Sequence, residues 1–255
     1  MEEIIKEQLN RIEQEHGVKI LYACESGSRA WGFPGTDSDY DVRFIYAAPI
    51  QHYLSIRDRR DVIELPVNEV LDVSGWDIRK ALQLFLKSNP HLYEWLQSPI
   101  CYKADPAFLK EMEYLMPVYF ASRPGCHHYL NIALSTFEND LSGNEVKLKR
   151  YFYALRSILA CLWIIENEVL PPMEFRLLRT LVGDQVWQNE VERLLEIKQS
   201  ASEKTIVPVV PFLHAWLKET IAFCKEKAAA IPSTQESIEP LDRLFQKYIN
   251  VPVVI

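Results

Sequence analysis

The chain has 255 residues, of which 48% are hydrophobic and 25% are charged, and its formal net charge is −7. This length allows one large domain or two small ones, and the composition is that of an ordinary globular protein. The excess of acidic residues argues against a protein that coats nucleic acid, although a local basic groove remains compatible with it. The longest apolar runs are too short to span a membrane, and the acidic, amphipathic first residues do not resemble a secretory signal.

The cysteines indicate a reducing compartment. There are five, and none forms a Cys-x-x-Cys pair: Cys24, Cys101, Cys126, Cys161 and Cys224. Their odd number and irregular spacing predict reduced, mostly buried thiols in a cytoplasmic protein. The string Cys126-His127-His128 has no second cluster of Cys and His at ligand spacing, so no zinc site is expected there.

The first predicted elements are a helix, a strand and a tight turn. Residues 2–16 carry apolar residues at helical spacing, and the apolar run 18–24 is typical of a buried strand. Gly27 then permits a turn that a Cβ would hinder, and small residues leave backbone N–H groups available to an anion. Ser28 adds a hydroxyl donor and Arg29 a charged fork that suits phosphate oxygens. This turn is a candidate phosphate site.

Two carboxylates follow about ten residues later. Asp39 and Asp41 are two residues apart, so on a strand they project from the same face. The alternation of apolar residues after Asp41 predicts a strand over 40–47. Neighbouring carboxylates repel each other unless a cation lies between them, and Mg²⁺ (or Mn²⁺) accepts oxygen ligands while keeping substrate phosphates in its shell. The turn and the carboxylate pair together indicate phosphoryl or nucleotidyl transfer.

These residues resemble a known family. Gly27-Ser28-Arg29, followed by Asp39-Tyr40-Asp41, is similar to the signature of the DNA polymerase β-type nucleotidyltransferase superfamily. The strings GSRAWGF, SDYDVRF, SGWDIRKAL and KSNP resemble the bacterial YcgL-like predicted nucleotidyltransferase family over about the first hundred residues, and more loosely over 146–165. The resemblance implies an α+β fold, with an N-terminal polymerase β-like palm built on a small mixed sheet and a C-terminal all-helical domain.

The order of the elements suggests two domains. Strands are predicted over 61–67 and 69–74, paired through Asn68, and an amphipathic helix over 78–86. Beyond residue 105 the pattern is helical apart from the Val-rich C-terminus, with candidate helices at 106–116, 126–141, 146–167, 174–182, 185–199, 209–229 and 239–249. We therefore expect a nucleotidyltransferase palm domain over 1–104 and a helical domain over 105–255, with the active site in the cleft between them.

The resemblance also implies a third carboxylate on a later strand. Asp72 lies between two apolar strand residues and matches this position best. Glu64 precedes a proline, which favours an edge strand, and Asp77 precedes the helix at 78–86, where N-capping accounts for it. We expect Asp39, Asp41 and Asp72 to be the catalytic residues and the metal ligands, and Asp77 and Glu64 remain alternatives to Asp72.

The predicted helix at 146–167 carries a second group of candidate residues. Lys149, Tyr153 and Arg156 lie on one helical face, and Arg156 adjoins a charge-free run that must be largely buried. A buried guanidinium needs an anion, which could be Glu138 or Glu166 in an internal salt bridge, or the substrate. The resemblance favours the substrate. We therefore expect an NTP-binding set formed by Gly27, Ser28, Arg29, Lys149, Tyr153 and Arg156.

The predicted function is metal-dependent transfer of an NMP from an NTP, with ATP as the expected NTP, to an acceptor hydroxyl, with release of pyrophosphate. The sequence does not decide among three acceptors. These are an RNA 3′ end in RNA repair, a small molecule as in aminoglycoside nucleotidyltransferases, and a protein hydroxyl as in AMPylation. A non-catalytic nucleotide sensor is the alternative from another class, and a missing third carboxylate would favour it. No membrane partner is expected, and the sequence does not determine the oligomeric state.

Overall fold

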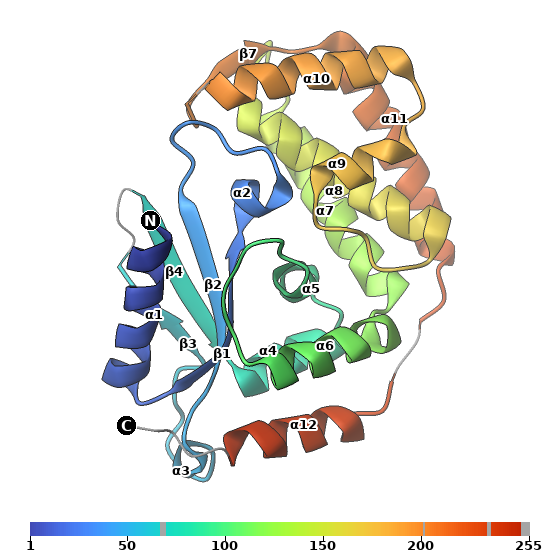
Figure 1. Ribbon diagram of the computed structural model, residues 1–255. Helices are drawn as coiled ribbons and strands as arrows, with labels where there is room; N and C mark the ends of the chain where they lie inside the picture. Colours follow the sequence, from blue (N-terminus) through green and yellow to red (C-terminus); the bar gives the residue numbers. More distant parts are fainter. Residues whose placement is uncertain (67–69, 201, 234–235, 251–255) are drawn as a thin grey trace. The chain divides into compact units, whose positions relative to one another are not determined.

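The structure is a computed structural model that describes residues 1–66, 70–200, 202–233 and 236–250 (Figure 1). Its described residues form two compact units. The sheet unit contains residues 1–27, 39–119 and 236–250, and the helical unit contains residues 28–38 and 120–233. The two units alternate along the chain, and the predicted division into domains at residue 104 remains a prediction.

The sheet unit is built on a mixed sheet of five strands in the order β3-β4-β2-β1-β5. The strands are β1 (Lys19–Ser26), β2 (Tyr40–Ala47), β3 (Val62–Glu64), β4 (Leu71–Asp77) and β5 (Cys101–Ala104). The β2–β4 pair is parallel, whereas β1 pairs antiparallel with β2 and β5, and β3 pairs antiparallel with β4. The strand β3 lies at the edge, as its nearby proline predicts. The turn predicted at Asn68 lies outside the described residues.

Alternation along β2 separates a core face from a polar face. Val42, Phe44 and Tyr46 are buried in the cluster that contains the apolar residues of α1 (Glu2–His16). Asp41 and Arg43 alternate with them and therefore point to the opposite face. In Figure 1, α1 covers one side of the sheet. The unit also contains α3 (Ile50–Tyr53), α4 (Ile78–Leu86), α5 (Pro90–Leu96), α6 (Pro106–Tyr119) and α12 (Glu239–Ile249).

The predicted role of Asp77 as a helix cap is confirmed. Asp77 is the N-cap of α4, and its carboxylate accepts a hydrogen bond from the backbone N–H of Arg79. Tyr93 and Trp95 are buried core residues of α5, and the ring of Trp95 lies 3.9 Å from that of Trp76. The end of β4 and the helices after it therefore act as scaffold, as their capping and apolar patterns suggest.

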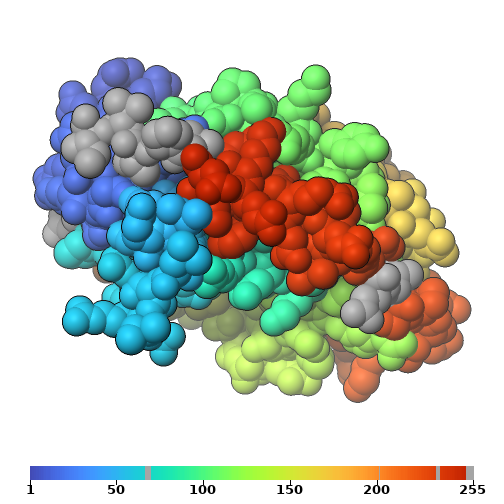
Figure 2. Space-filling model, turned by 90° about the horizontal axis from the view of Figure 1, so that it is seen from below, coloured from blue at the N-terminus to red at the C-terminus, as the bar shows by residue number. Residues whose placement is uncertain are grey.

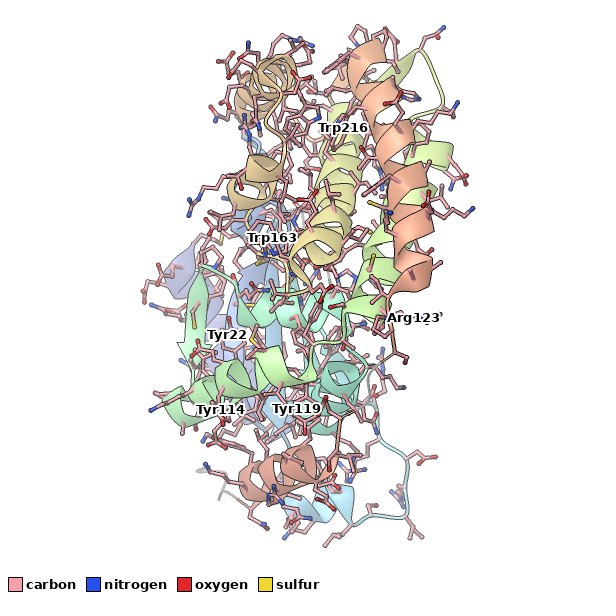
Figure 3. All side chains as sticks on the ribbon, turned by 90° about the vertical axis from the view of Figure 1, so that its right-hand side faces the viewer. Tyr22, Tyr114, Tyr119, Arg123, Trp163 and Trp216 are labelled. Atoms are coloured by element: carbon pink, nitrogen blue, oxygen red, sulfur yellow. The ribbon has the colours of Figure 1, made fainter. Side chains whose placement is uncertain are left out.

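The helical unit packs around α8 (Leu148–Asn167), whose charge-free run 157–165 is mostly buried. The other helices are α2 (Gly27–Trp31, which begins in the sheet unit), α7 (Ser122–Asp140), α9 (Phe175–Leu178), α10 (Gln185–Ser200) and α11 (Pro211–Ala230). In Figure 3, α7, α8 and α11 run side by side, with Trp163 on α8 and Trp216 on α11. Arg123 on α7 donates to the carbonyl of Ile231, which follows α11.

The predicted absence of strands beyond residue 105 is wrong in one place. Two short strands, β6 (Glu145–Lys147) and β7 (Ile206–Pro208), pair antiparallel in the helical unit. Strands of three residues span too few alternations for a periodic pattern to reveal them. The α+β class is confirmed, because a mixed sheet comes first and the rest of the chain is largely helical. No helix in the described ranges is both long and apolar enough to cross a membrane.

Candidate functional site

The turn after β1 and the start of β2 meet at Gly27 and Asp41. Gly27 has a φ of +62°, and a Cβ at this position would lie 2.1 Å from Oδ2 of Asp41. Glycine is therefore required twice, once for the left-handed backbone and once for the close approach of the carboxylate. The predicted turn is the first turn of α2, and its backbone lies against one of the predicted metal ligands.

The parallel pairing of β2 and β4 brings two predicted carboxylates together. In the register of the two strands, Asp41 is the direct neighbour of Asp72. Arg43 bridges them, because its Nη2 donates to Oδ1 of Asp41 at 3.1 Å and to Oδ2 of Asp72 at 2.7 Å. Both carboxylate side chains are 32% exposed and so remain accessible from solvent. The guanidinium supplies the positive charge that two neighbouring carboxylates require.

The two alternatives to Asp72 lie elsewhere in the sheet unit. Asp77 is at the far end of β4, where it caps α4 and accepts a hydrogen bond from the hydroxyl of Tyr53. Burial raises the pKa of Asp77. Glu64 is exposed on the edge strand β3 and pairs with Arg60. The structure therefore brings neither side chain beside Asp41, although the catalytic role of Asp72 itself remains a prediction.

The carboxylates suit a hard divalent cation. Asp41 and Asp72 offer partly exposed oxygen ligands, and a side-chain cation already lies between them. Asp39 is exposed and comes immediately before β2, two residues from Asp41. Within the ranges that the structure describes, no three His, Cys, Asp or Glu side chains converge closely enough to hold a metal. The donor chemistry fits Mg²⁺ or Mn²⁺, and Arg43 would have to yield part of its contact to either ion.

A buried glutamate holds the backbone of Asp41 in place. Glu25 is completely buried near the end of β1, and its Oε1 accepts the backbone N–H of Asp41 at 2.8 Å. The hydroxyl of Tyr102 donates to the other oxygen of Glu25. A buried carboxylate costs free energy unless it is hydrogen-bonded, and here both oxygens are. Glu25 therefore acts as a positioning residue for Asp41.

In the helical unit, Ser28 and Arg29 contact the loop that leads to β2. The hydroxyl of Ser28 donates to Oγ of Ser38 at 3.2 Å, and Nη2 of Arg29 donates to the carbonyl of Ser38 at 2.7 Å. Ser38 in turn donates to Oε1 of Glu203 at 3.0 Å. The backbone N–H of Glu203 donates to Asp37 at 2.8 Å. The predicted phosphate turn is thereby linked to a carboxylate about 175 positions away in the chain.

Glu203 also pairs with two lysines. Lys149 donates to its Oε2, and Lys198, which is 1% exposed, donates to its Oε1 at 3.2 Å. Burial alone would raise the pKa of Glu203, but the hydrogen bond and charge of Lys149 and the charge of Lys198 outweigh burial and lower it. Burial disfavours the ammonium of Lys149, yet its bond to Glu203 raises the pKa of this lysine. Two ammonium groups and one hydroxyl thus converge on a single pair of anionic oxygens.

The other two predicted residues on α8 contact Trp31 of α2. Tyr153 packs edge-on against the Trp31 ring, with the ring centres 5.2 Å apart. The Arg156 guanidinium lies 4.4 Å from the centre of the same ring. Arg156 is 4% exposed, and its Nε and Nη2 donate to the carbonyl of Met173 at 3.1 and 3.0 Å. This face of α8 therefore supports the short helix that carries the phosphate turn.

Almost the whole chain matches a known protein family. Residues 1–247 match RlaP, described as the RNA repair pathway DNA polymerase beta family. The chain belongs to this family. An uncharacterized protein, YcgL from Bacillus subtilis (strain 168), is 44% identical to it over 247 residues, which are 96% of this chain and 95% of that protein. The predicted resemblance to polymerase β-type nucleotidyltransferases is confirmed, and the description of the family names an RNA repair pathway.

A solved structure is also similar to this RlaP family member. It is a nucleotidyltransferase-like protein from Exiguobacterium sibiricum 255-15, with 11% sequence identity and a TM-score of 0.30. The match covers 89% of this chain and 75% of that one. A similarity at this level supports no statement about the site.

Four residues of the site were not among the predicted ones: Glu25, Arg43, Lys198 and Glu203. Two of them had a local signal. Arg43 shares the alternation of Asp41 on β2, and Glu25 is a charged residue at the end of an apolar run. Lys198 and Glu203 had none, because their partners are distant in the chain and surface lysines and glutamates look alike in a helical pattern.

Proposed function

We propose that this protein transfers a nucleoside monophosphate from an NTP to the 3′ hydroxyl of an RNA strand and releases pyrophosphate. The observation that carries the proposal is the register of β2 and β4, because it brings the carboxylates of Asp41 and Asp72 side by side. The family's link to RNA repair favours an RNA 3′ end as acceptor over a small molecule or a protein hydroxyl.

The carboxylates would hold the metal and accept the proton. Asp39, Asp41 and Asp72 are the ligands proposed for Mg²⁺ or Mn²⁺, which would neutralise charge on the phosphates and activate the acceptor hydroxyl. Asp72 would accept the proton of that hydroxyl as general base. Arg43 holds the carboxylates of Asp41 and Asp72 close together, and Glu25 fixes the backbone of Asp41.

The nucleotide phosphates would bind at the turn and at the lysines. Gly27, Ser28, Arg29 and Lys149 are the proposed triphosphate contacts. Lys198 joins this set because it shares the anion of Lys149, the carboxylate of Glu203. A triphosphate carries more charge than a carboxylate, so it would compete with Glu203 for the two ammonium groups. We take ATP as the NTP.

The proposal assigns an indirect role to the aromatic and guanidinium side chains of α8. Tyr153 and Arg156 both lie against Trp31, and Trp31 is the last residue of α2. Because Gly27 and Ser28 open the same short helix, the two side chains would act on the nucleotide by keeping this helix in place.

A non-catalytic nucleotide sensor is the second candidate, and one observation favours it. Arg43 bonds both Asp41 and Asp72, so a protein that binds nucleotide without metal would keep this arrangement. The two candidates differ in one outcome, since a sensor binds NTP but forms no product. Asp41→Asn would leave NTP affinity nearly unchanged in a metal-independent sensor.

The test is a transfer assay with purified protein, α-labelled NTPs, Mg²⁺ and two RNAs that differ only at the 3′ end. We expect label on the RNA with a free 3′ hydroxyl and none on the RNA with a 3′ phosphate. Asp41→Asn should abolish transfer, whereas Asp242→Asn, which removes one carboxylate from the first turn of α12, should not. Equal labelling of both RNAs, or full transfer by Asp41→Asn, would overturn the proposal.

A further inference from the structure

A pocket in the sheet unit lies away from the carboxylates of Asp41 and Asp72. It has a volume of about 440 Å³ and is lined by residues from the far ends of β2 and β4, including Tyr46 and Asp77. These two residues are register neighbours, five positions along the strands from Asp41 and Asp72. Five residues of a strand span roughly 17 Å, so the pocket is distinct from the proposed transfer site.

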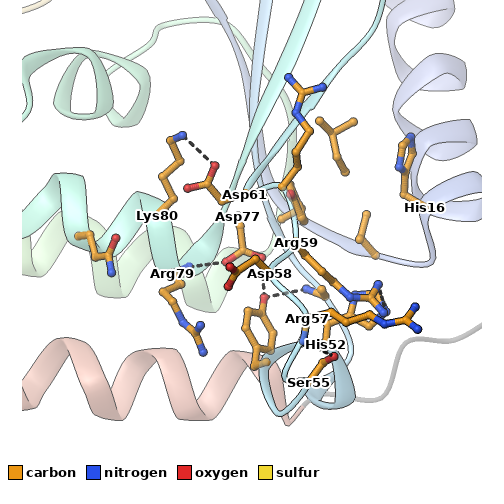
Figure 4. A pocket seen from close by; sticks show the side chains of 17 residues that line it. His16, His52, Ser55, Arg57, Asp58, Arg59, Asp61, Asp77, Arg79 and Lys80 are labelled. Carbon is orange, nitrogen blue, oxygen red and sulfur yellow. Dashed lines mark hydrogen bonds and ion pairs between the residues drawn. The ribbon is translucent and has the colours of Figure 1, made fainter.

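The pocket is rich in cationic side chains. Arg57, Arg59 and Arg60 come from the connection between α3 and β3, and Arg79 and Lys80 come from the start of α4. Figure 4 shows Arg57, Arg59 and His52 on one side of the pocket, with Arg79 and Lys80 on the other. In Figure 2 the residues after α3 lie at the surface next to α12.

Two of these cations are neutralised by carboxylates. Lys80 pairs with Asp61 at 3.0 Å, and Arg60 pairs with Glu64 at 2.9 Å. Asp77, the buried carboxylate of the pocket, is engaged by the hydroxyl of Tyr53 and by the N-terminal turn of α4. Asp61 and Asp77 are therefore engaged elsewhere and form no ion pair with Arg57 or Arg59.

Two of the loop arginines, Arg57 and Arg59, have no carboxylate partner in the described ranges. The Arg57 side chain forms no hydrogen bond or ion pair there, and Arg59 donates from Nη1 to Nε2 of His52 at 3.2 Å. An imidazole nitrogen that accepts from arginine must be unprotonated, and burial and the charge of Arg59 both lower the pKa of His52. His52 thus orients Arg59 without neutralising it. Asp58, exposed between the two arginines, is one carboxylate against two guanidinium groups.

Arg79 adds a third guanidinium, on the opposite wall of the pocket. The guanidinium carbon of Arg79 lies 5.0 Å from the ring centre of Tyr53 and 5.1 Å from that of Phe245, so both rings contact this cation. Such cation–π contacts orient a guanidinium without neutralising its charge. The pocket therefore has the guanidinium group of Arg79 on one wall and those of Arg57 and Arg59 on the other.

We propose that this pocket binds a small phosphorylated ligand, with its phosphate groups on Arg57 and Arg59. Guanidinium forks match phosphate oxygens in geometry and charge, and a ligand with two or more negative charges would balance the unpaired arginines. The volume falls within the range of small-molecule pockets, which suits a nucleotide or a ligand of similar size. This site goes beyond the proposed transfer reaction and does not depend on it.

Pyrophosphate is the probe for a direct test, used without divalent metal. Its binding is measured by calorimetry, and hydrogen–deuterium exchange of residues 49–61 reports whether it occupies this pocket. We expect protection of this segment in the wild type and in Lys149→Gln, which separates the pocket from the proposed nucleotide site. In Arg57→Gln/Arg59→Gln the concentration needed for protection should rise by about tenfold or more.

Two further variants make the result specific. Arg11→Gln/Arg193→Gln removes the same charge from exposed arginines that pair with Glu15 and Glu190, and it should behave as wild type. Arg57→Lys/Arg59→Lys keeps the charge but loses the forks, and it should weaken binding less than the Gln pair. The proposal is overturned if pyrophosphate leaves residues 49–61 unprotected, if the Gln pair binds as wild type, or if only an RNA oligonucleotide protects the segment.

Discussion

The backbone of Gly27 and the carboxylate of Asp41 are in contact, with no room for a side chain between them. A Cβ at residue 27 would stand 2.1 Å from Oδ2 of Asp41. This contact joins the turn that is proposed to bind phosphate to a carboxylate that is proposed to bind metal. Any residue larger than glycine must therefore move Asp41, the backbone of the turn, or both.

Gly27→Ala should reduce transfer by about a hundredfold, the loss that follows from a displacement of about 1 Å in an active site. Its left-handed φ adds a cost of about 1–2 kcal/mol in stability. Gly17→Ala is the matched control, because Gly17 has a φ of +60° and no atom near the position of a Cβ. This control should lose similar stability and keep its activity. Equal activity losses in both variants would show that backbone strain alone is responsible.

Asp72→Asn should lower turnover by at least about a hundredfold, which is the lower end of the range expected when a general base is lost. Asp77→Asn should leave turnover close to wild type and cost little stability, because Asn caps a helix nearly as well as Asp. Steady-state rates with a labelled NTP and thermal melts measure the two effects. The opposite ranking of rates would assign the third carboxylate to Asp77.

Arg43→Gln removes the cation that bridges Asp41 and Asp72. Without it the two carboxylates repel each other, so the variant should be less stable in the absence of divalent metal. Mg²⁺ should then raise the Tm of the variant by more than that of the wild type, because binding to the folded state stabilises it. Melts with and without Mg²⁺ provide the comparison. An identical Mg²⁺ response in both proteins would contradict binding of metal at these carboxylates.

Glu203→Gln should strengthen NTP binding by about tenfold. Glu203 is the anion that a triphosphate must displace from Lys149 and Lys198, and the amide competes less well for the two ammonium groups. NTP titration followed by calorimetry checks this. Glu196→Gln, a change on the neighbouring helix α10, is the control and should leave affinity unaltered. Weaker NTP binding in Glu203→Gln would mean that its carboxylate supports the nucleotide site.

The same ion pairs predict how stability responds to acid. The pKa of Glu203 is lowered in the folded protein, so folding favours its ionised form. The stabilisation is therefore present above the usual carboxyl pKa and is lost as the pH falls through the lower folded value. Denaturant unfolding at a series of pH values should show a smaller acid-side loss in Glu203→Gln than in wild type. Parallel pH profiles would show that the carboxylate contributes nothing in this range.

Local patterns in the sequence determined most of the secondary structure. The predicted strand at 40–47 and the predicted helix at 78–86 agree with β2 and α4 to the residue, since alternation and amphipathic spacing are properties of adjacent residues. The cap at Asp77 was readable for the same reason. Family motifs were readable as well, because Gly27-Ser28 and Asp39-Tyr40-Asp41 lie in short segments.

Only the tertiary structure decided which side chains meet. Arg43 and Asp72 are 29 positions apart, and their contact depends on the parallel register of β2 and β4, which no alternation specifies. Lys149 and Glu203 are 54 positions apart and meet through the packing of the helical unit. Long-range pairs of this kind are set by how strands align and helices pack. The short motifs can therefore be recognised in the sequence, whereas the ion-paired side chains that hold them in place cannot.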